Sequence, residues 1–108
     1  MTALYDLSAR ELGRAYRERS LSPVDVVQAV LAHIARWEPH LQATYLLRPD
    51  AALEQARASQ ARWQRGEARG PLDGVPVTIK ENIATRGDPI PSGTAAVELR
   101  AAAADAPP

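Results

Sequence analysis

The chain has 108 residues, which is the length of one domain and excludes a second independent one. Ala accounts for 21 residues, whereas Leu, Ile, Val and Phe together account for 22, so a thin core is expected. Thirteen basic residues balance thirteen acidic ones, with a net +2 over residues 1–65 and −2 over residues 66–108. This even distribution argues against a protein that binds nucleic acid or anionic lipid.

The cysteine content and the first twenty residues limit the class further. With no cysteine, the chain has no disulfide framework, thiol nucleophile or cysteine-based metal site. The first twenty residues mix basic and acidic side chains, and no apolar run long enough for a signal peptide or a membrane span follows them. A cytoplasmic location without a membrane partner is therefore expected.

The sequence predicts two helix N-termini near the beginning of the chain. Ser8-Ala9-Arg10-Glu11 is a capping box, which predicts a helix over residues 9–19. Ser22-Pro23-Val24-Asp25 combines a cap, a first-turn proline and an acidic residue at the positive helix end. An apolar face at three- and four-residue spacing and the Glu38-Pro39 stop predict an amphipathic helix over residues 23–37. The residues of that face are Val27, Val30, Leu31, Ile34 and Trp37.

The middle of the chain predicts a connector, a third helix and a strand. Residues 41–47 suit a short strand or an extended connector. The Ala-rich run over residues 50–65 predicts a helix closed by Gly66. Apolar and polar residues then alternate over residues 75–80, which predicts a strand. Residues 81–108 are expected to form a loop and tail, with room for one helical turn near Val97 and Leu99.

Lys80, the only lysine, ends the predicted strand. A lysine that is held by strand pairing and buried can lose its proton and act as a general base. The alternative is a lysine that protects an exposed sheet edge from pairing with another chain. The position of Lys80 alone does not separate these two interpretations.

The segment Gly70-Pro71-Leu72-Asp73-Gly74-Val75-Pro76-Val77-Thr78-Ile79-Lys80-Glu81-Asn82 resembles the amidase signature family. Nine positions match that family's pattern, and Glu81 stands where aspartate is usual. The helix opening at Leu21, the extended piece, the Ala-rich helix and residues 83–94 also look like the N-terminal region of the family, so the resemblance covers essentially the whole chain. It implies an α/β fold of which residues 1–108 are a partial, N-terminal portion with about three helices and one or two short strands.

The resemblance also implies a function. Enzymes of this family hydrolyse carboxylic amides with a Ser–cis-Ser–Lys triad and without a metal or organic cofactor, and Lys80 corresponds to the lysine of that triad. Both serines belong to a glycine- and serine-rich segment downstream of the lysine, which this chain does not contain. None of its five serines sits in a nucleophile elbow, so the 108 residues alone are expected to be inactive. The five are Ser8, Ser20, Ser22, Ser59 and Ser92.

Other hypotheses stay open at this point. The chain could be a non-catalytic interaction module that forms a homo-oligomer or pairs with a missing C-terminal portion, or it could be the remnant of a truncated gene. The partner expected from the resemblance is a small-molecule amide, bound by the intact enzyme. His33 and His40 lack metal-ligand spacing, and the arginines at 62, 65 and 69 are interpreted as a solvated helix face.

Overall fold

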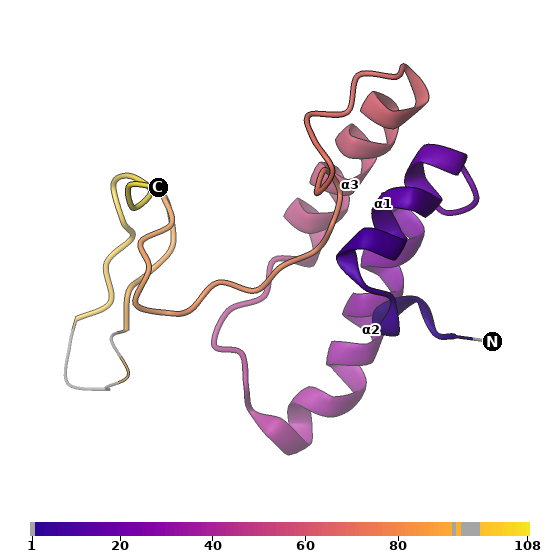
Figure 1. Cartoon of the computed structure of the whole chain (residues 1–108). Helices are drawn as coiled ribbons and strands as arrows, with labels where there is room; N and C mark the ends of the chain where they lie inside the picture. The colour runs from indigo at the N-terminus through magenta and orange to yellow at the C-terminus, as the bar shows by residue number, and fades with distance from the viewer. Residues whose placement is uncertain (1, 92, 94–97) are drawn as a thin grey trace. The chain divides into compact units, whose positions relative to one another are not determined.

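The computed structural model describes residues 2–91, 93 and 98–108, and these divide into two units, Met1–Pro76 and Val77–Pro108. The helices all lie in the first unit (Figure 1). Among the described residues, none of the helices combines the length and the apolar character that crossing a bilayer requires. The elements are η1 (Leu4–Asp6), α1 (Ala9–Glu18), α2 (Pro23–Leu41) and α3 (Pro49–Gln64).

Both predicted helix starts are confirmed. The Ser8 hydroxyl accepts a hydrogen bond from the Glu11 backbone N–H at 3.1 Å, and the Glu11 carboxylate accepts one from the Ser8 N–H at 2.9 Å. Ser22 and Asp25 make the same reciprocal pair, at 3.1 and 3.3 Å. Each box satisfies two backbone donors that have no partner within the helix, so the local sequence fixes both starts.

Helix α2 continues past its predicted end, to Leu41. Pro39 lies in the last turn and is exposed, where its missing N–H frees a single carbonyl that water can reach. The helix stops at Gln42, whose φ of 48° is left-handed. Just beyond, the Glu38 carboxylate accepts a hydrogen bond from the Thr44 backbone N–H at 2.9 Å, and this bond lowers the pKa of Glu38.

The third predicted helix is confirmed with a shift of one residue, as α3. Gly66, two residues beyond its end, has the left-handed φ of +70° that its position predicted. Residues 42–48 form a connector without a strand, which agrees with the extended alternative for this stretch.

The core of the first unit is small, as the composition predicted. Leu12, Tyr16 and Val26 are buried together at its centre, and α2 packs against α3 and η1. The apolar face predicted for α2 is only partly correct, because its far end leaves the core and Trp37 is 42% exposed. The partly buried side chains around the centre are Leu7, Leu21, Val30, Trp63 and Val75.

The strand predicted over residues 75–80 is not present, which corrects the sequence analysis. Val75 packs against the core, but Val77 and Ile79 are 77% and 53% exposed, and none of the six residues has a strand partner. A strand needs a neighbour to accept and donate its backbone hydrogen bonds, which alternation alone does not supply. In the second unit the described ladder contacts are isolated bridges, Arg86 with Ala102 and Pro89 with Ala101. The predicted turn at Val97 lies outside the described residues.

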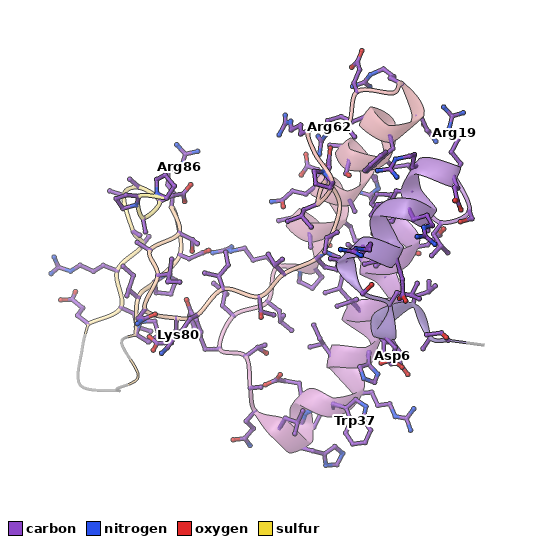
Figure 2. The ribbon with its side chains drawn as sticks, in the orientation of Figure 1. Asp6, Arg19, Trp37, Arg62, Lys80 and Arg86 are labelled. Carbon is purple, nitrogen blue, oxygen red and sulfur yellow. The ribbon has the colours of Figure 1, made fainter. Side chains whose placement is uncertain are left out.

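A buried carboxylate holds the loop that follows α3. The side chain of Asp73 is 3% exposed and accepts two hydrogen bonds from the Arg62 guanidinium, at 2.6 and 2.8 Å. It also accepts the Ser59 hydroxyl at 2.7 Å and the Arg69 backbone N–H at 3.0 Å. The hydrogen bonds from Arg62 are the main reason that the pKa of Asp73 falls well below its usual range. Figure 2 labels Arg62 on α3, beside this loop.

The backbone of the same loop is held from two helices. The Trp63 indole of α3 donates to the Asp73 carbonyl at 2.9 Å, and the Tyr16 hydroxyl of α1 donates to the Gly74 carbonyl at 2.9 Å. Burial raises the pKa of Tyr16 to about 12, so this hydroxyl remains a donor at neutral pH. We call the contacts of Asp73 and Gly74 with Tyr16, Ser59, Arg62, Trp63 and Arg69 the Asp73 anchor.

The anchor requires glycine at position 74, and this can be tested. Gly74 has a φ of +87°, and a Cβ there would lie 2.5 Å from the Ser59 Oγ and 2.7 Å from a Pro23 ring carbon. We expect Gly74→Ala to lower the free energy of unfolding by about 3 kcal/mol, since strain and overlap add.

Two other glycines provide matched controls for urea unfolding. Gly66→Ala adds only the left-handed strain of about 1 kcal/mol, because its Cβ would meet nothing within 4 Å. Gly70→Ala has neither a positive φ nor a close neighbour and should be nearly neutral. Equal losses at positions 66 and 74 would contradict the close packing described for Gly74.

The Asp73 carboxylate should make stability depend on acid pH. Its folded pKa is depressed, so its contribution is present above the ordinary aspartate pKa of about 4 and is lost as the pH falls below that value. At pH 7 we expect Asp73→Asn to cost about 1 to 2 kcal/mol, because Arg62 is partly in water and the pair is partly screened.

Thermal unfolding of the parent chain and Asp73→Asn between pH 2 and pH 7 checks this. The difference in Tm should be largest near pH 7 and should shrink below about pH 4. A difference that stays constant over this range would contradict an ionised Asp73 in the folded state.

Candidate functional site

Lys80, the candidate catalytic residue, lies in the second unit and is exposed (Figure 2). Its carbonyl accepts a hydrogen bond from the Ile83 backbone N–H at 3.0 Å, which closes a turn directly after the lysine. The residues before it form no strand, so the expected placement at a strand end is not found. Among the described residues, Lys80 does not have the buried surroundings that favour a neutral amine.

The motif that carries Lys80 is divided between the two units. Its first part, through Pro76, contains the Asp73 anchor. Its second part begins at Val77 and exposes Val77 and Ile79 together with Lys80. Ile83, just after the motif, is 49% exposed. The part of the motif that is held by hydrogen bonds therefore precedes Lys80, the residue that corresponds to the triad lysine of the family.

Glu81 carries a polar atom that sequence reasoning missed. One of its carboxylate oxygens, Oε2, is buried and lacks a hydrogen-bond partner among the described residues. A buried acceptor without a donor is unfavourable. The only sequence signal was the departure from the family's aspartate at this position, which does not indicate burial. Nearby, the Thr85 hydroxyl donates to Asp88 at 2.8 Å, and the Arg86 N–H donates to Asp105 at 2.7 Å.

The described serines have structural contacts. Ser8 and Ser22 are helix caps, as predicted. The Ser20 hydroxyl donates to a backbone carbonyl of α1 at 3.4 Å. Ser59 is buried and donates to Asp73. Ser92 lies outside the described residues. The four described serines are therefore in helix caps, on a backbone carbonyl or on the Asp73 carboxylate, which also pairs with Arg62.

The arginines after residue 60 do not share one role. Arg62 is not part of a solvated face, because its guanidinium is 19% exposed and pairs with Asp73. Arg65 does agree with that interpretation, since its pair with Glu67 is exposed on both sides. The sequence around Asp73 does not predict its pairing with Arg62, because the pairing depends on how the loop folds back onto α3. The Asp73 pair is therefore the main polar contact that sequence reasoning missed.

The histidines of α2 take part in ring contacts. His33 stacks on Tyr5 with a centroid distance of 3.7 Å, and Trp37 lies 6.3 Å from His33 and 6.1 Å from His40. Among the residues that the structure describes, no group of three His, Cys, Asp or Glu side chains could hold a metal ion. The contacts of His33 and His40 are thus aromatic.

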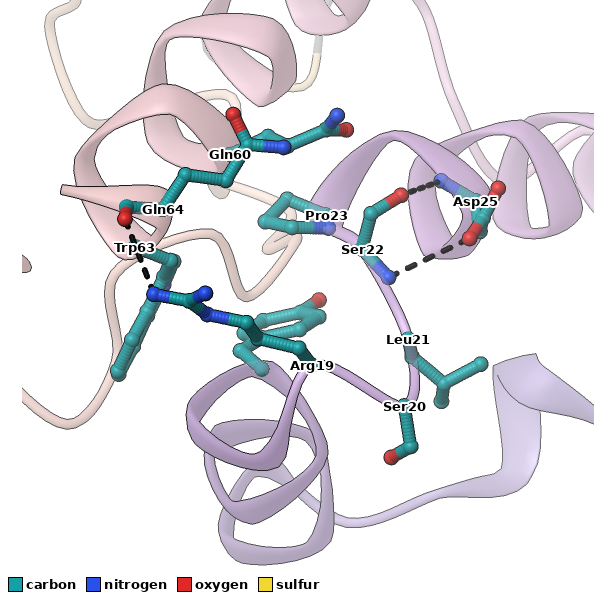
Figure 3. Close-up of a pocket in the computed structure, with 10 residues that line it drawn as sticks. Arg19, Ser20, Leu21, Ser22, Pro23, Asp25, Gln60, Trp63 and Gln64 are labelled. Atoms are coloured by element: carbon teal, nitrogen blue, oxygen red, sulfur yellow. Dashed lines mark hydrogen bonds between the residues drawn. The ribbon is translucent and has the colours of Figure 1, made fainter. Parts of the chain in front are cut away.

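A pocket of about 180 Å³ lies where α1 turns into α2, against α3 (Figure 3). Several of its polar groups are engaged, because Ser22 and Asp25 bond each other and Arg19 donates to the Gln64 carbonyl at 3.0 Å. Sites for small molecules usually measure about 300–1,000 Å³. This pocket is therefore smaller than a typical ligand site.

Comparison with known proteins places the motif in a family. The family model described as Amidase matches residues 25–107. The chain is 40% identical over 94 residues to a glutamyl-tRNA(Gln) amidotransferase subunit from Chloroflexus aurantiacus, covering 87% of this chain and 19% of that protein. It is 42% identical over 98 residues to the corresponding subunit from Thermobifida fusca, covering 91% of this chain and 20% of that protein.

A mitochondrial relative from Ixodes scapularis, which carries the same amidotransferase name, is 38% identical over 84 residues, with 78% of this chain and 16% of that protein covered. The chain thus spans about a fifth of the length of the curated relatives it matches. No solved structure matches it. The family match covers most of the chain, including Lys80 and the anchored loop, and the chain therefore belongs to the amidase signature family.

Proposed function

We propose that these residues are the N-terminal portion of an amide-cleaving enzyme in which Lys80 is the general base. The observation that carries the proposal is the motif over residues 70–82, which lies within the family match and contains the chain's only lysine. In the intact domain, which we propose to be α/β, residues 1–108 supply the helical part. The remainder would supply both serines of the triad and the sheet.

The proposed mechanism requires a neutral Lys80. Its amine takes a proton from the cis-serine, which takes one from the nucleophilic serine as that oxygen attacks the amide carbonyl. The proton is returned to the departing amine, and water then releases the acyl group from the serine. Burial of Lys80 by the remainder of the protein would disfavour its charged form and make it a better base at neutral pH. No metal or organic cofactor enters this scheme.

A second candidate is one component of an amidotransferase. The relatives described above are each named as a subunit of a glutamyl-tRNA(Gln) amidotransferase, at about 40% identity. In that case the same lysine would serve amide transfer, and the protein would work together with other subunits. The two candidates share the first chemical step and differ in the acceptor of the released nitrogen. Free ammonia indicates hydrolysis, whereas activity that needs partner subunits indicates transfer.

The role of Lys80 can be tested in a fusion protein. The 108 residues would replace the matching N-terminal part of the Thermobifida fusca relative, and ammonia release from acetamide, benzamide, asparagine and glutamine would be measured with any partner subunits present. We expect Lys80→Ala to lower kcat at least about a thousandfold, because the triad acts as a unit. Lys80→Arg should lose as much, because arginine keeps the charge but does not give up its proton.

The matched control is Arg100→Ala, which removes another exposed cation from the same unit. It should leave kcat unchanged. Circular dichroism would show that all variants are folded. Activity retained by Lys80→Arg would contradict a general base and would indicate that only the positive charge matters.

The 108-residue chain produced alone should not hydrolyse these amides. Only the base of the proposed triad is present in it, and the Lys80 side chain is exposed. The measurement is ammonia release by the purified chain against a buffer blank. Hydrolysis that Lys80→Ala abolishes would contradict this expectation and would require a nucleophile within these residues.

A further inference from the structure

The Asp73 anchor lies close to the candidate base along the chain. Asp73 precedes Lys80 by seven residues, and Gly74 precedes it by six. The anchor contacts belong to the unit Met1–Pro76, so they reach to within two residues of its last position. Whatever fixes residues 73 and 74 therefore also fixes where the segment bearing Lys80 begins.

The anchor fixes both position and direction. Two carbonyls, those of Asp73 and Gly74, receive hydrogen bonds from Trp63 and Tyr16, which lie on different helices. The carboxylate of Asp73 receives four more, two of them from one planar guanidinium. Donors from different directions restrain the rotation as well as the displacement of a peptide unit.

Among the described residues, the second part of the motif has no contacts like those of the anchor. Val77, Ile79 and Lys80 are exposed, and none of them belongs to a strand. Only the turn bond from Ile83 to the Lys80 carbonyl is close by. The segment that carries the lysine therefore follows the anchor directly along the chain.

We propose that Asp73 is a positioning residue for Lys80, acting with Arg62 to fix the start of the segment that carries the base. This inference rests on the proposed function of Lys80. Asp73 does not touch the reacting atoms, and its effect passes through the backbone of residues 74–79. Proton transfer needs heavy atoms within about 2.6–3.2 Å, and a misplacement of about 1 Å can cost on the order of a hundredfold in rate.

The first test compares Asp73→Asn with Val27→Ala in the fusion protein. Val27 is a buried residue of α2 outside the cluster of Leu12, Tyr16 and Val26, so its truncation lowers stability without removing an anchor contact. At a temperature well below both Tm values, we expect Asp73→Asn to lower kcat about tenfold to a hundredfold with KM within about twofold. Val27→Ala should leave kcat unchanged. Equal kcat values in the two variants, or a loss confined to KM, would overturn the proposal.

The second test does not depend on activity. Because the chain has no cysteine, Leu72→Cys and Arg57→Cys can carry a pair of spin labels, with Leu72 exposed beside Asp73 and Arg57 exposed on α3. Pulsed electron paramagnetic resonance then gives the distribution of distances between the two labels in the 108-residue chain. We expect the distribution to broaden when Asp73→Asn is added and to stay unchanged with Val27→Ala. A width that Asp73→Asn does not alter would overturn the proposal.

The two tests separate this inference from the proposed function. If the fusion protein is inactive with every amide, the chemistry assigned to Lys80 fails, and the spin-label distances alone decide whether Asp73 positions the segment. If the fusion protein is active and Lys80→Ala abolishes the activity, the kcat of Asp73→Asn decides whether that positioning matters for the reaction.

Discussion

The hydrogen-bonded pair of Arg62 and Asp73 is the contact on which the end of the helical unit depends. A carboxylate that is 3% exposed is tolerated because the guanidinium, a hydroxyl and a backbone N–H satisfy it. The pair joins α3 to the loop that follows it, and Tyr16 joins the same loop to α1. The apolar core is small and by itself fixes only part of the chain. Directional hydrogen bonds such as these therefore contribute to holding the loop in one conformation.

The family motif therefore contains two physically different parts. Gly74 and its neighbours are in close contact with helices, and only glycine fits the left-handed turn against Ser59 and Pro23. Val77, Ile79 and Lys80 are exposed, and within the part of the chain that the structure describes they have no comparable contacts. In the proposed enzyme the first part would hold the start of the second part in place. The exposed apolar side chains would then be covered by residues beyond those described.

Local signals predicted the helices well because their causes are local. The caps at Ser8 and Ser22 and the glycine at 66 act within a few residues, so their effects can be read from the sequence. The predicted end of α2 was wrong because a proline in an exposed last turn removes only one backbone hydrogen bond, which water can replace. The strand over residues 75–80 was wrong because alternation describes one strand, whereas a sheet needs a second.

By itself the sequence determined the three helices, the thin core and the family motif that contains Lys80, since each depends on neighbouring residues or on a recognisable pattern. The tertiary structure alone decided that Asp73 is buried against Arg62 and Ser59, and that the motif divides at Pro76 into an anchored and an exposed part. The physical reason is distance along the chain. A charged residue in a loop gives no sign of its partner until the loop folds back on the helix that carries it.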